Sequence, residues 1–282
     1  MNIQQALLSA TKKINRKQPT SAHLDAEILL SFVTNKPKTY LHSHLEKNIT
    51  NAQKNKYNNL VNKRKNGSPI AYLINNRDFY SLSFYINKNV LIPRPETETL
   101  VEEVIKQARH LKQSIGKNDT ITIVDIGTGS GCISVTLAKY LPYAKIIATD
   151  ISQKALDVAK RNAKLHKVLN RITFKKGNLL KAVTKQTPPD IIVSNLPYLT
   201  KKELSNVPKE PKLALYGGKL GLEIIDELFI QISELEKQPI ILLEIAPHQF
   251  KAIDYFAEQK LNKKISHPVK DLAGRDRIAI IK

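Results

Sequence analysis

The chain has 282 residues, which on length alone favours about two domains, and its 41% apolar and 25% charged residues are ordinary for a globular protein. No apolar run approaches the roughly 20 residues that cross a bilayer, the start MNIQQALLSATKK lacks a signal-peptide pattern, and the single cysteine, Cys132, excludes an internal disulfide framework, so we expect a cytoplasmic protein without membrane contact. The net charge of +20 favours an acidic partner such as nucleic acid, but 36 of the 45 basic residues are lysine, and we favour a compositional drift toward lysine and asparagine as the explanation.

The first part of the chain has helical patterns. The stretch SAHLDAEILLSFVTN begins with Ser21 as a candidate N-cap and places Leu24, Ile28 and Phe32 on one helix face. Further helical stretches fall at 3–14 and 50–65. We predict a helical domain over 1–75 and interpret it as a substrate-recognition domain, because the residues that suit chemistry all lie later in the chain.

Residues 77–92, RDFYSLSFYINKNVLI, alternate apolar and polar positions, which is typical of a β-hairpin. The next segment, IPRPETETLVEEVIKQ, has two prolines before a helical pattern with acids in its first turn, as at a helix start. We therefore predict a hairpin linker over 76–93 and a further domain over 94–282.

In that domain apolar runs alternate with helical patterns. The expected strands are 121–126, 145–149, 171–175, 190–195, 239–245 and 277–282, and the expected helices include 131–140, 152–166 and 220–236. This alternation predicts an α/β fold, a doubly wound Rossmann-like sheet with helices on both faces. Ligands of such sheets bind beyond the carboxyl ends of the strands.

The first two strand ends suit a nucleoside ligand. The first runs into a glycine-rich turn, Gly127, Thr128, Gly129, Ser130 and Gly131, which lets backbone approach a ligand closely. This turn alone is shared by dinucleotide and phosphate sites. The second strand ends in Asp150, whose carboxylate suits two ribose hydroxyls. A helix-capping role for Asp150 stays open, because a helix begins near Ser152.

The third and fourth strand ends carry amide side chains. Asn178 suits an adenine edge and Leu179 its ring, although an ordinary loop and core would also account for both. At the fourth, Asn195-Leu196-Pro197-Tyr198, the Asn195 side-chain carbonyl and the backbone carbonyl of Leu196 would hold both hydrogens of a planar –NH₂ group. Tyr198 would stack on its plane, and this geometry aims the nitrogen at an electrophile.

The chain resembles the release-factor glutamine methyltransferases, the HemK/PrmC family, over almost its whole length. The resemblance rests on a set of motifs: GSPIAYL (67–73), LIPRPETETLVE (91–102), DIGTGSGCIS (125–134), SNLPY (194–198), EPKLALYGGKLGL (210–222), LLEIAPHQ (242–249) and DLAGRDR (271–277). It implies a helical N-terminal domain, a hairpin hinge and an S-adenosylmethionine-dependent methyltransferase domain. The family's reaction methylates the side-chain amide nitrogen of the glutamine in the GGQ motif of peptide chain release factors.

Carried over position by position, the resemblance implies roles for the residues above. The cofactor set is Gly127, Thr128, Gly129, Ser130, Gly131, Asp150, Asn178, Leu179 and Asn195. The substrate amide and the chemistry fall to Asn195, Leu196, Pro197 and Tyr198, and Arg94 and Glu96 have orienting roles toward the substrate. Leu196 departs from the family, which has proline there; proline fixes φ and leucine does not, so the carbonyl is held less firmly.

Other functions stay open at this point. Adenine's amino group is also planar and would suit the same site as a flipped base, and a ribosomal-protein glutamine is a close variant. A non-enzymatic module that has lost catalysis has only Leu196 in its favour. The seven histidines show no metal-ligand spacing, so we expect no metal. We expect a monomer whose partner is a release factor.

Overall fold

The computed structural model describes residues 1–15, 21–116, 119–183, 188–205, 207, 209–271 and 273–282. It divides into two compact units, Met1–Asn76 and Arg77–Lys282, which are described separately. The hairpin that begins at the end of the first unit consists of β1 (Asn76–Phe79) and β2 (Leu82–Tyr85). Apart from its first residue, the hairpin therefore groups with the second unit.

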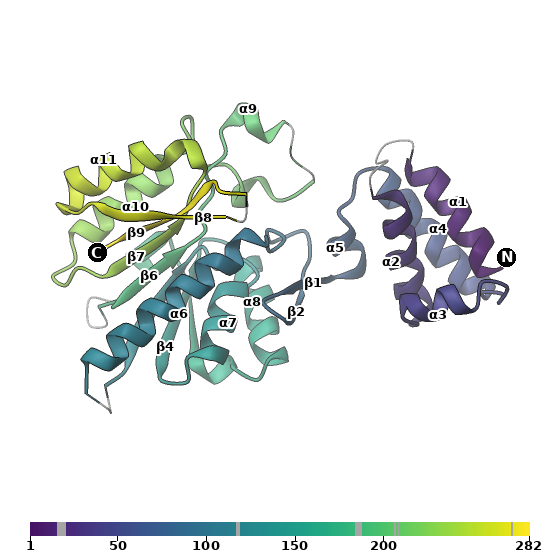
Figure 1. Cartoon of the computed structure of the whole chain (residues 1–282), viewed down its shortest axis with the longest axis horizontal. Helices are drawn as coiled ribbons and strands as arrows, with labels where there is room; N and C mark the ends of the chain where they lie inside the picture. Colours follow the sequence, from purple (N-terminus) through teal and green to yellow (C-terminus); the bar gives the residue numbers. More distant parts are fainter. Residues whose placement is uncertain (16–20, 117–118, 184–187, 206, 208, 272) are drawn as a thin grey trace. The chain divides into compact units, whose positions relative to one another are not determined.

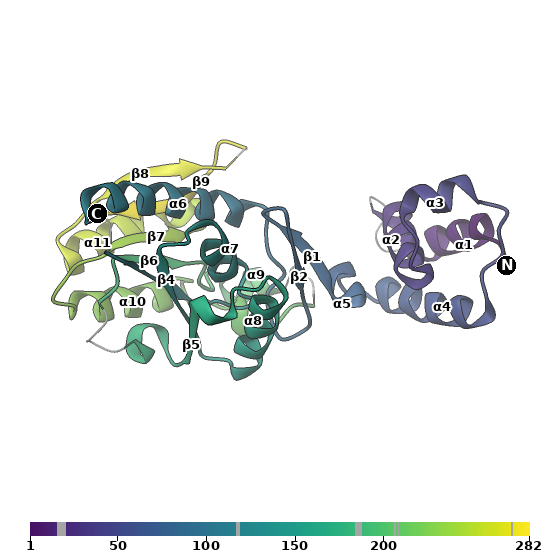
Figure 2. The same cartoon turned by 90° about the horizontal axis from the view of Figure 1, so that it is seen from below.

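The first unit is helical. Its helices are α1 (Ile3–Asn15), α2 (Ala22–Thr34), α3 (Lys38–Ser43), α4 (Asn51–Lys65) and α5 (Ile70–Ile74). Helices α1, α2 and α4 pack on one another around a shared apolar core (Figure 2). Helix α4 begins with a capping box, in which Thr50 and Gln53 each satisfy the other's backbone N–H.

The packing of α2 differs from the prediction at both its start and its apolar face. Ser21 is the N-cap residue, but its hydroxyl donates to Asp25 and makes no capping bond. Leu24 and Phe32 are 47% and 40% exposed. The buried face of α2 consists of smaller and aliphatic residues that fit between α1 and α4: Ala22, Ala26, Leu29 and Leu30.

The second unit continues with α6 (Glu96–Ser114) and an alternation of strands and helices. The strands are β3 (Ile121–Ile126), β4 (Ala144–Asp150), β5 (Ile172–Lys176), β6 (Ile191–Ser194), β7 (Ile240–Glu244), β8 (Ile265–Lys270) and β9 (Asp276–Ile281). The helices between them are α7 (Cys132–Tyr140), α8 (Gln153–Leu165), α9 (Lys201–Leu204), α10 (Glu223–Ser233) and α11 (Phe250–Leu261).

Within the described residues these strands form one sheet in the order β5-β4-β3-β6-β7-β9-β8. The first five are parallel, and β9 pairs antiparallel with both β7 and β8. Strand β3 lies at the centre and all six of its residues are buried, as a parallel strand covered on both faces requires. The strand order reverses at β3, because β4 and β5 follow on one side of it and β6 and β7 on the other.

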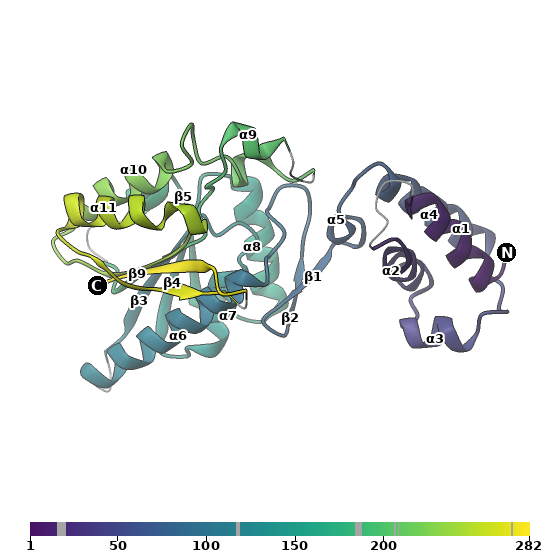
Figure 3. The same ribbon diagram turned by 45° about the horizontal axis from the view of Figure 1, so that its top comes forward.

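Helices cover both faces of this sheet. In Figures 1 and 3, α6, α7 and α8 lie on one side of it and α10 and α11 on the other. The predicted Rossmann-like α/β class is confirmed. The prediction lacked α11 and β8, a strand with a proline at position 268.

Among the described residues, no helix is both long and apolar enough to span a membrane.

Candidate active site

The glycine-rich turn after β3 is held from below by Asp125. The Thr128 hydroxyl and the Ser134 backbone N–H donate to Asp125 Oδ2, at 2.6 and 3.2 Å. Asp125 Oδ1 has no hydrogen-bond partner within the described part of the chain. Complete burial raises the pKa of Asp125 to about 7, although these two donors act in the opposite direction. Asp125 thus fixes the turn without facing the ligand space.

The end of the turn packs closely on α8. Gly131 adopts φ 78°, and a Cβ there would lie 2.9 Å from Ala159 Cβ, so both conformation and contact require glycine. The buried Asn162 side chain donates to the carbonyls of Ser130 and Tyr85, at 2.8 and 3.0 Å. Asn162 therefore ties the turn to strand β2 of the hairpin.

Asp150, at the end of β4, binds the turn as well as facing the cavity. Its Oδ2 accepts from the Gly129 N–H at 2.9 Å, and its Oδ1 accepts from the Ser152 N–H at 2.8 Å. Burial raises the pKa of Asp150 and these backbone donors lower it. The capping bond at α8 comes from Ser152, whose hydroxyl accepts from the Ala155 N–H. The Asp150 carboxylate still has lone pairs for vicinal hydroxyls.

The third strand end places Asn178 and Leu179 beside the same cavity. The Asn178 side chain donates to Glu227 Oε1 at 2.7 Å, which holds the amide against α10. Leu179 has φ 52° and a buried side chain in the core under the cavity. Leucine rarely adopts a positive φ, so the surrounding packing enforces this conformation. Both residues line the cavity.

The fourth strand end carries the predicted amide-binding loop. The Asn195 Nδ2 donates to the Thr97 hydroxyl at 3.1 Å, which leaves the Asn195 Oδ1 available to accept hydrogens. Leu196 is buried, and its side chain packs below Gly127 in the core shared with Ile126. Leucine at this position thus fills core space that connects the loop with the glycine-rich turn.

Thr97 and Glu244 support that loop from beneath. The Thr97 hydroxyl donates to Glu244 Oε2 at 2.6 Å, and both residues are buried. Burial raises the pKa of Glu244 to about 7; the bond from Thr97 and the charges of Arg277 and Arg94 lower it, whereas Glu96 raises it. Burial is also the main cause of the raised pKa of Tyr198.

A salt bridge joins two segments that line the cavity. Arg94 Nη2 lies 2.6 Å from Glu210 Oε1, and the Ile92 N–H donates to the other Glu210 oxygen at 3.1 Å. The Glu210 side chain is almost completely buried. Arg94 is thereby held at the cavity wall beside Asn195, with Leu213 in the following segment.

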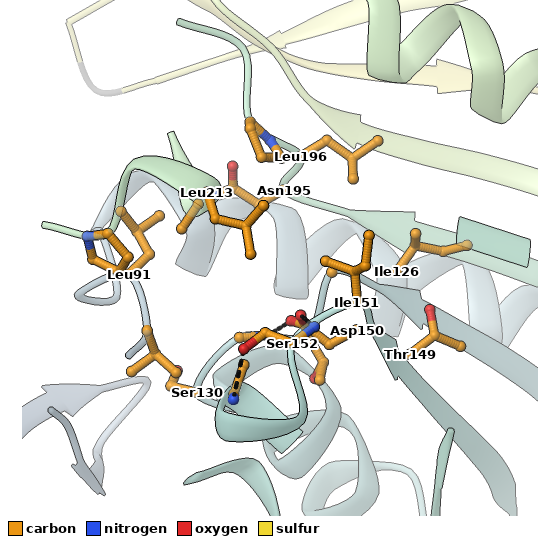
Figure 4. A pocket seen from close by; sticks show the side chains of 18 of the residues that line it. Leu91, Ile126, Ser130, Thr149, Asp150, Ile151, Ser152, Asn195, Leu196 and Leu213 are labelled. Carbon is orange, nitrogen blue, oxygen red and sulfur yellow. Dashed lines mark hydrogen bonds between the residues drawn. The ribbon is translucent and has the colours of Figure 1, made fainter. Parts of the chain in front are cut away.

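The four strand ends enclose a cavity of about 360 Å³, within the roughly 300–1,000 Å³ of small-molecule sites. Figure 4 shows Leu91 and Leu213 beside Asn195, with Asp150 and Ile151 across from them. An adjoining cavity of about 100 Å³ reaches Tyr198. Both cavities share the residues Leu91, Arg94, Asn195, Leu196, Pro197 and Ala214.

The residues predicted from sequence mostly converge on these two cavities. The main cavity is lined by Arg94, Gly127, Thr128, Gly129, Ser130, Asp150, Asn178, Leu179, Asn195, Leu196 and Pro197. Tyr198 lines only the adjoining one. Gly131 and Glu96 line neither: Gly131 packs on α8, and Glu96 stands in the first turn of α6.

The sequence interpretation gave no role to several residues that build the site: Thr97, Asp125, Glu210 and Glu244. Each lies inside one of the motifs quoted above, but none stands out at its own place in the sequence. An acid at the end of an apolar run, as at Glu244, was the available signal. No cluster of three or more histidine, cysteine, aspartate or glutamate side chains that would hold a metal occurs in the described ranges.

The donors and walls of the main cavity fit a nucleoside. Asp150 presents a carboxylate for the hydroxyls of a ribose, and the apolar Leu179 and Ile151 border space for a flat base. The glycine-rich turn lets a ligand lie close to its backbone. Asn195, whose Oδ1 is not used by Thr97, lines the same cavity. The arrangement suits a nucleoside cofactor with a planar amide or amine substrate at its far end.

Comparisons with known proteins agree with this arrangement. Residues 5–74 match the PrmC N-terminal domain, and residues 100–210 match the methyltransferase small domain. The hMettl16 catalytic domain, solved in complex with the MAT2A 3′UTR hairpin 6, superposes with a TM-score of 0.56 at 15% identity. That superposition covers 83% of this chain and 82% of the other, and supports the fold alone.

Full-length relatives are more specific. The release factor glutamine methyltransferase of Rhodopirellula baltica is 37% identical, over 95% of this chain and 92% of the relative. That of Dictyoglomus turgidum is 36% identical, over 98% and 96%. Together with the strand-end geometry, these similarities show that the chain belongs to the release factor glutamine methyltransferase family.

Proposed function

We propose that the chain transfers a methyl group from S-adenosylmethionine to the side-chain amide nitrogen of the glutamine in the GGQ motif of peptide chain release factors. The family supplies the reaction class. The observation that carries the proposal to this chain is the orientation of Asn195, whose –NH₂ is taken by Thr97 and whose carbonyl oxygen is left for a substrate amide.

The residues that line the main cavity support the assignment of the cofactor to it. Asp150 would accept from the ribose hydroxyls, and Leu179 and Ile151 would border the adenine, with Asn178 beside them. The turn from Gly127 to Gly131 would pass close to the remainder of the molecule. Bound there, S-adenosylmethionine supplies an electrophilic methyl group.

The substrate amide would lie at the loop after β6. Asn195 Oδ1 and the Leu196 carbonyl would each accept one hydrogen of the amide nitrogen, and Tyr198 would cover its plane. Holding both hydrogens fixes the nitrogen's direction, and a correctly oriented reactant is worth several kcal/mol of barrier. The nitrogen would form its bond to the methyl carbon as the S–CH₃ bond breaks, with S-adenosylhomocysteine as the leaving group, and would lose a proton to solvent afterwards, so the chain would need no general base for the attack.

Further parts of the proposal rest on the match of residues 5–74 to the PrmC N-terminal domain and on the nature of the proposed substrate, a release factor. We assign recognition of the release factor to the helical unit, over 1–75, and orienting roles to Arg94 and Glu96. A release factor acts at the ribosome, so the cytoplasm is the place for this activity, and we expect the chain to act as a monomer. Nucleic acid would bind only non-specifically, through the net positive charge of the chain.

Methyl transfer from labelled S-adenosylmethionine tests the reaction. The acceptors would be a purified release factor, the same factor with its GGQ glutamine changed to alanine, total RNA, DNA, and ribosomal proteins. We expect label on the intact factor alone. Label on RNA or DNA would contradict the proposal and indicate methylation of the amino group of a base. Label on ribosomal proteins alone would indicate that the methylated glutamine belongs to a ribosomal protein and not to a release factor.

A further inference from the structure

A line of polar contacts runs from the buried Glu244 to the amide-binding loop. Glu244 ends β7, Thr97 lies in the first turn of α6, and Asn195 follows β6. Asn195 Nδ2 donates to Thr97 Oγ1 at 3.1 Å, and Thr97 Oγ1 donates to Glu244 Oε2 at 2.6 Å. Glu244 and Thr97 are 3% and 2% exposed, so water does not compete for these bonds.

The order of donors along this line is set by the carboxylate. An ionised carboxylate only accepts, so the single hydroxyl proton of Thr97 is committed to Glu244. The Thr97 oxygen is then an acceptor toward Asn195, and of the two ends of the amide only the –NH₂ can donate to it. The other end, the carbonyl oxygen, must face the cavity.

We propose that Glu244, acting through Thr97, holds the Asn195 amide in the one orientation that can accept hydrogens from the substrate. This inference rests on the proposed function, since it explains how the same site is prepared for a –NH₂ group. Glu244 and Thr97 are positioning residues, because they act on the substrate only through Asn195: Thr97 borders the cavity, and Glu244 lies behind Thr97.

Protonation of Glu244 would undo the arrangement. A neutral carboxyl can donate to Thr97, whose hydroxyl then becomes free to donate to Asn195. That reversed line favours the flipped amide, which turns the Asn195 –NH₂ group toward the –NH₂ group of the substrate, so that two donors face each other. The pKa of Glu244, raised by burial to about 7, puts this change within reach of ordinary pH.

Charged and titratable groups face Glu244 from several elements. Arg94 and Glu96 lie before and in α6, and Arg277 lies on β9. Tyr198 lies in the amide-binding loop, and Cys132 begins α7. The two arginines favour the carboxylate and Glu96 opposes it. The ionised form is therefore supported from two sides.

Two substitutions at Thr97 separate positioning from packing. Thr97→Val keeps the shape and removes the hydroxyl, whereas Thr97→Ser keeps the hydroxyl. We expect Thr97→Val to lower kcat with release factor at least 10-fold while the Kd for S-adenosylmethionine changes less than 3-fold, and Thr97→Ser to stay within about 3-fold of the parent. Thr136→Val is the matched control, because Thr136 is buried, donates to the Cys132 carbonyl and lines neither cavity.

The pH profile gives the second readout. In the parent chain, kcat should fall as pH drops below about 7, since Glu244 gains its proton there. Glu244→Gln should have a lower plateau without that acidic limb. The inference is overturned if Thr97→Val behaves like Thr136→Val, or if Glu244→Gln retains the acidic limb. Failure of the proposed function is distinct, because the parent chain itself would then leave the release factor unmethylated.

Discussion

Asp125 and Glu244 are buried carboxyls that lie beneath two parts of the site, the glycine-rich turn and the amide-binding loop. Burial raises the pKa of each to about 7. In an unfolded chain their pKa values would be near 4. A raised folded-state pKa means that these groups favour folding fully below about pH 4 and that this contribution is lost as pH rises through 7.

Glu244→Gln should therefore stabilise the protein under alkaline conditions while it lowers activity. A pKa raised from 4.5 to about 7 corresponds to on the order of 3 kcal/mol at pH 8, from about 1.4 kcal/mol per pKa unit. Urea unfolding of the parent and the variant at pH 5 and pH 8 measures the free energy of unfolding of each. We expect the variant's advantage over the parent to be larger at pH 8 than at pH 5. The same difference in unfolding free energy at both pH values would contradict the assigned ionisation of Glu244.

The sequence predicts the residues that face the ligand better than those that hold them. Asn195 and Asp150 end apolar runs, and a polar side chain at the end of a parallel strand is a recognisable signal. In the sequence alone, Thr97 is one residue in the first turn of an expected helix, and Glu244 is a residue near the end of an expected strand. Only the fold brings positions 97, 195 and 244 together, so no local pattern could have joined them.

At the level of elements, the amide-binding loop is held by close backbone contact with residues 215–221. The Leu199 N–H donates to the Leu215 carbonyl and the Gly217 N–H to the Leu199 carbonyl, both at 2.9 Å. A Cβ at Gly217 would lie 2.5 Å from the Pro197 carbonyl oxygen and 2.7 Å from the Tyr198 Cα. Gly217 is therefore required by the approach of two backbones.

Gly217→Ala should displace the loop and lower kcat/KM for the release factor at least 10-fold, because the clashing atoms are backbone and cannot rotate away. The Kd for S-adenosylmethionine should change little. Gly116→Ala is the control, since a Cβ there meets only the flexible Asp119 side chain. Steady-state kinetics and titration calorimetry compare the two, and equal kinetics for both would show that the loop tolerates the shift.

Element prediction succeeded where the apolar pattern and burial coincide and failed where they do not. All of β3 is apolar except Thr122 and Asp125, and its bounds match the prediction. Two residues of the predicted apolar face of α2, Leu24 and Phe32, are exposed, because small residues such as Ala22 and Ala26 fit better against neighbouring helices. In the part of the chain that the structure describes, strand β8 pairs with β9 alone, at the edge of the sheet, where a weaker apolar pattern suffices.

On the scale of the whole molecule, the proposed function divides cofactor binding and recognition of the release factor between the two units. Every residue that lines the main cavity lies between Lys88 and Glu227, within the second unit. The helical unit has a core of its own, which includes Leu29, Leu30 and Tyr57. Its removal should therefore spare the cofactor site.

A chain of residues 77–282 should bind S-adenosylmethionine within about 3-fold of the full chain and methylate the release factor at least 10-fold less efficiently, through a higher KM. Calorimetry and steady-state kinetics measure both, with circular dichroism as the control for folding. Full-chain efficiency in the folded fragment would show that the helical unit does not recognise the substrate.

The most direct test of the proposed function concerns Asn195, whose carbonyl oxygen is assigned to the substrate amide. For Asn195→Ala, methyl transfer to release factor and the Kd for S-adenosylmethionine should be measured on the same preparation. We predict a loss of kcat on the order of 10²-fold or more, the scale seen when one preorganised hydrogen-bonding group is removed, with the Kd changed by no more than a few-fold. Equal losses in transfer and cofactor binding, or transfer that survives the substitution, would contradict this assignment.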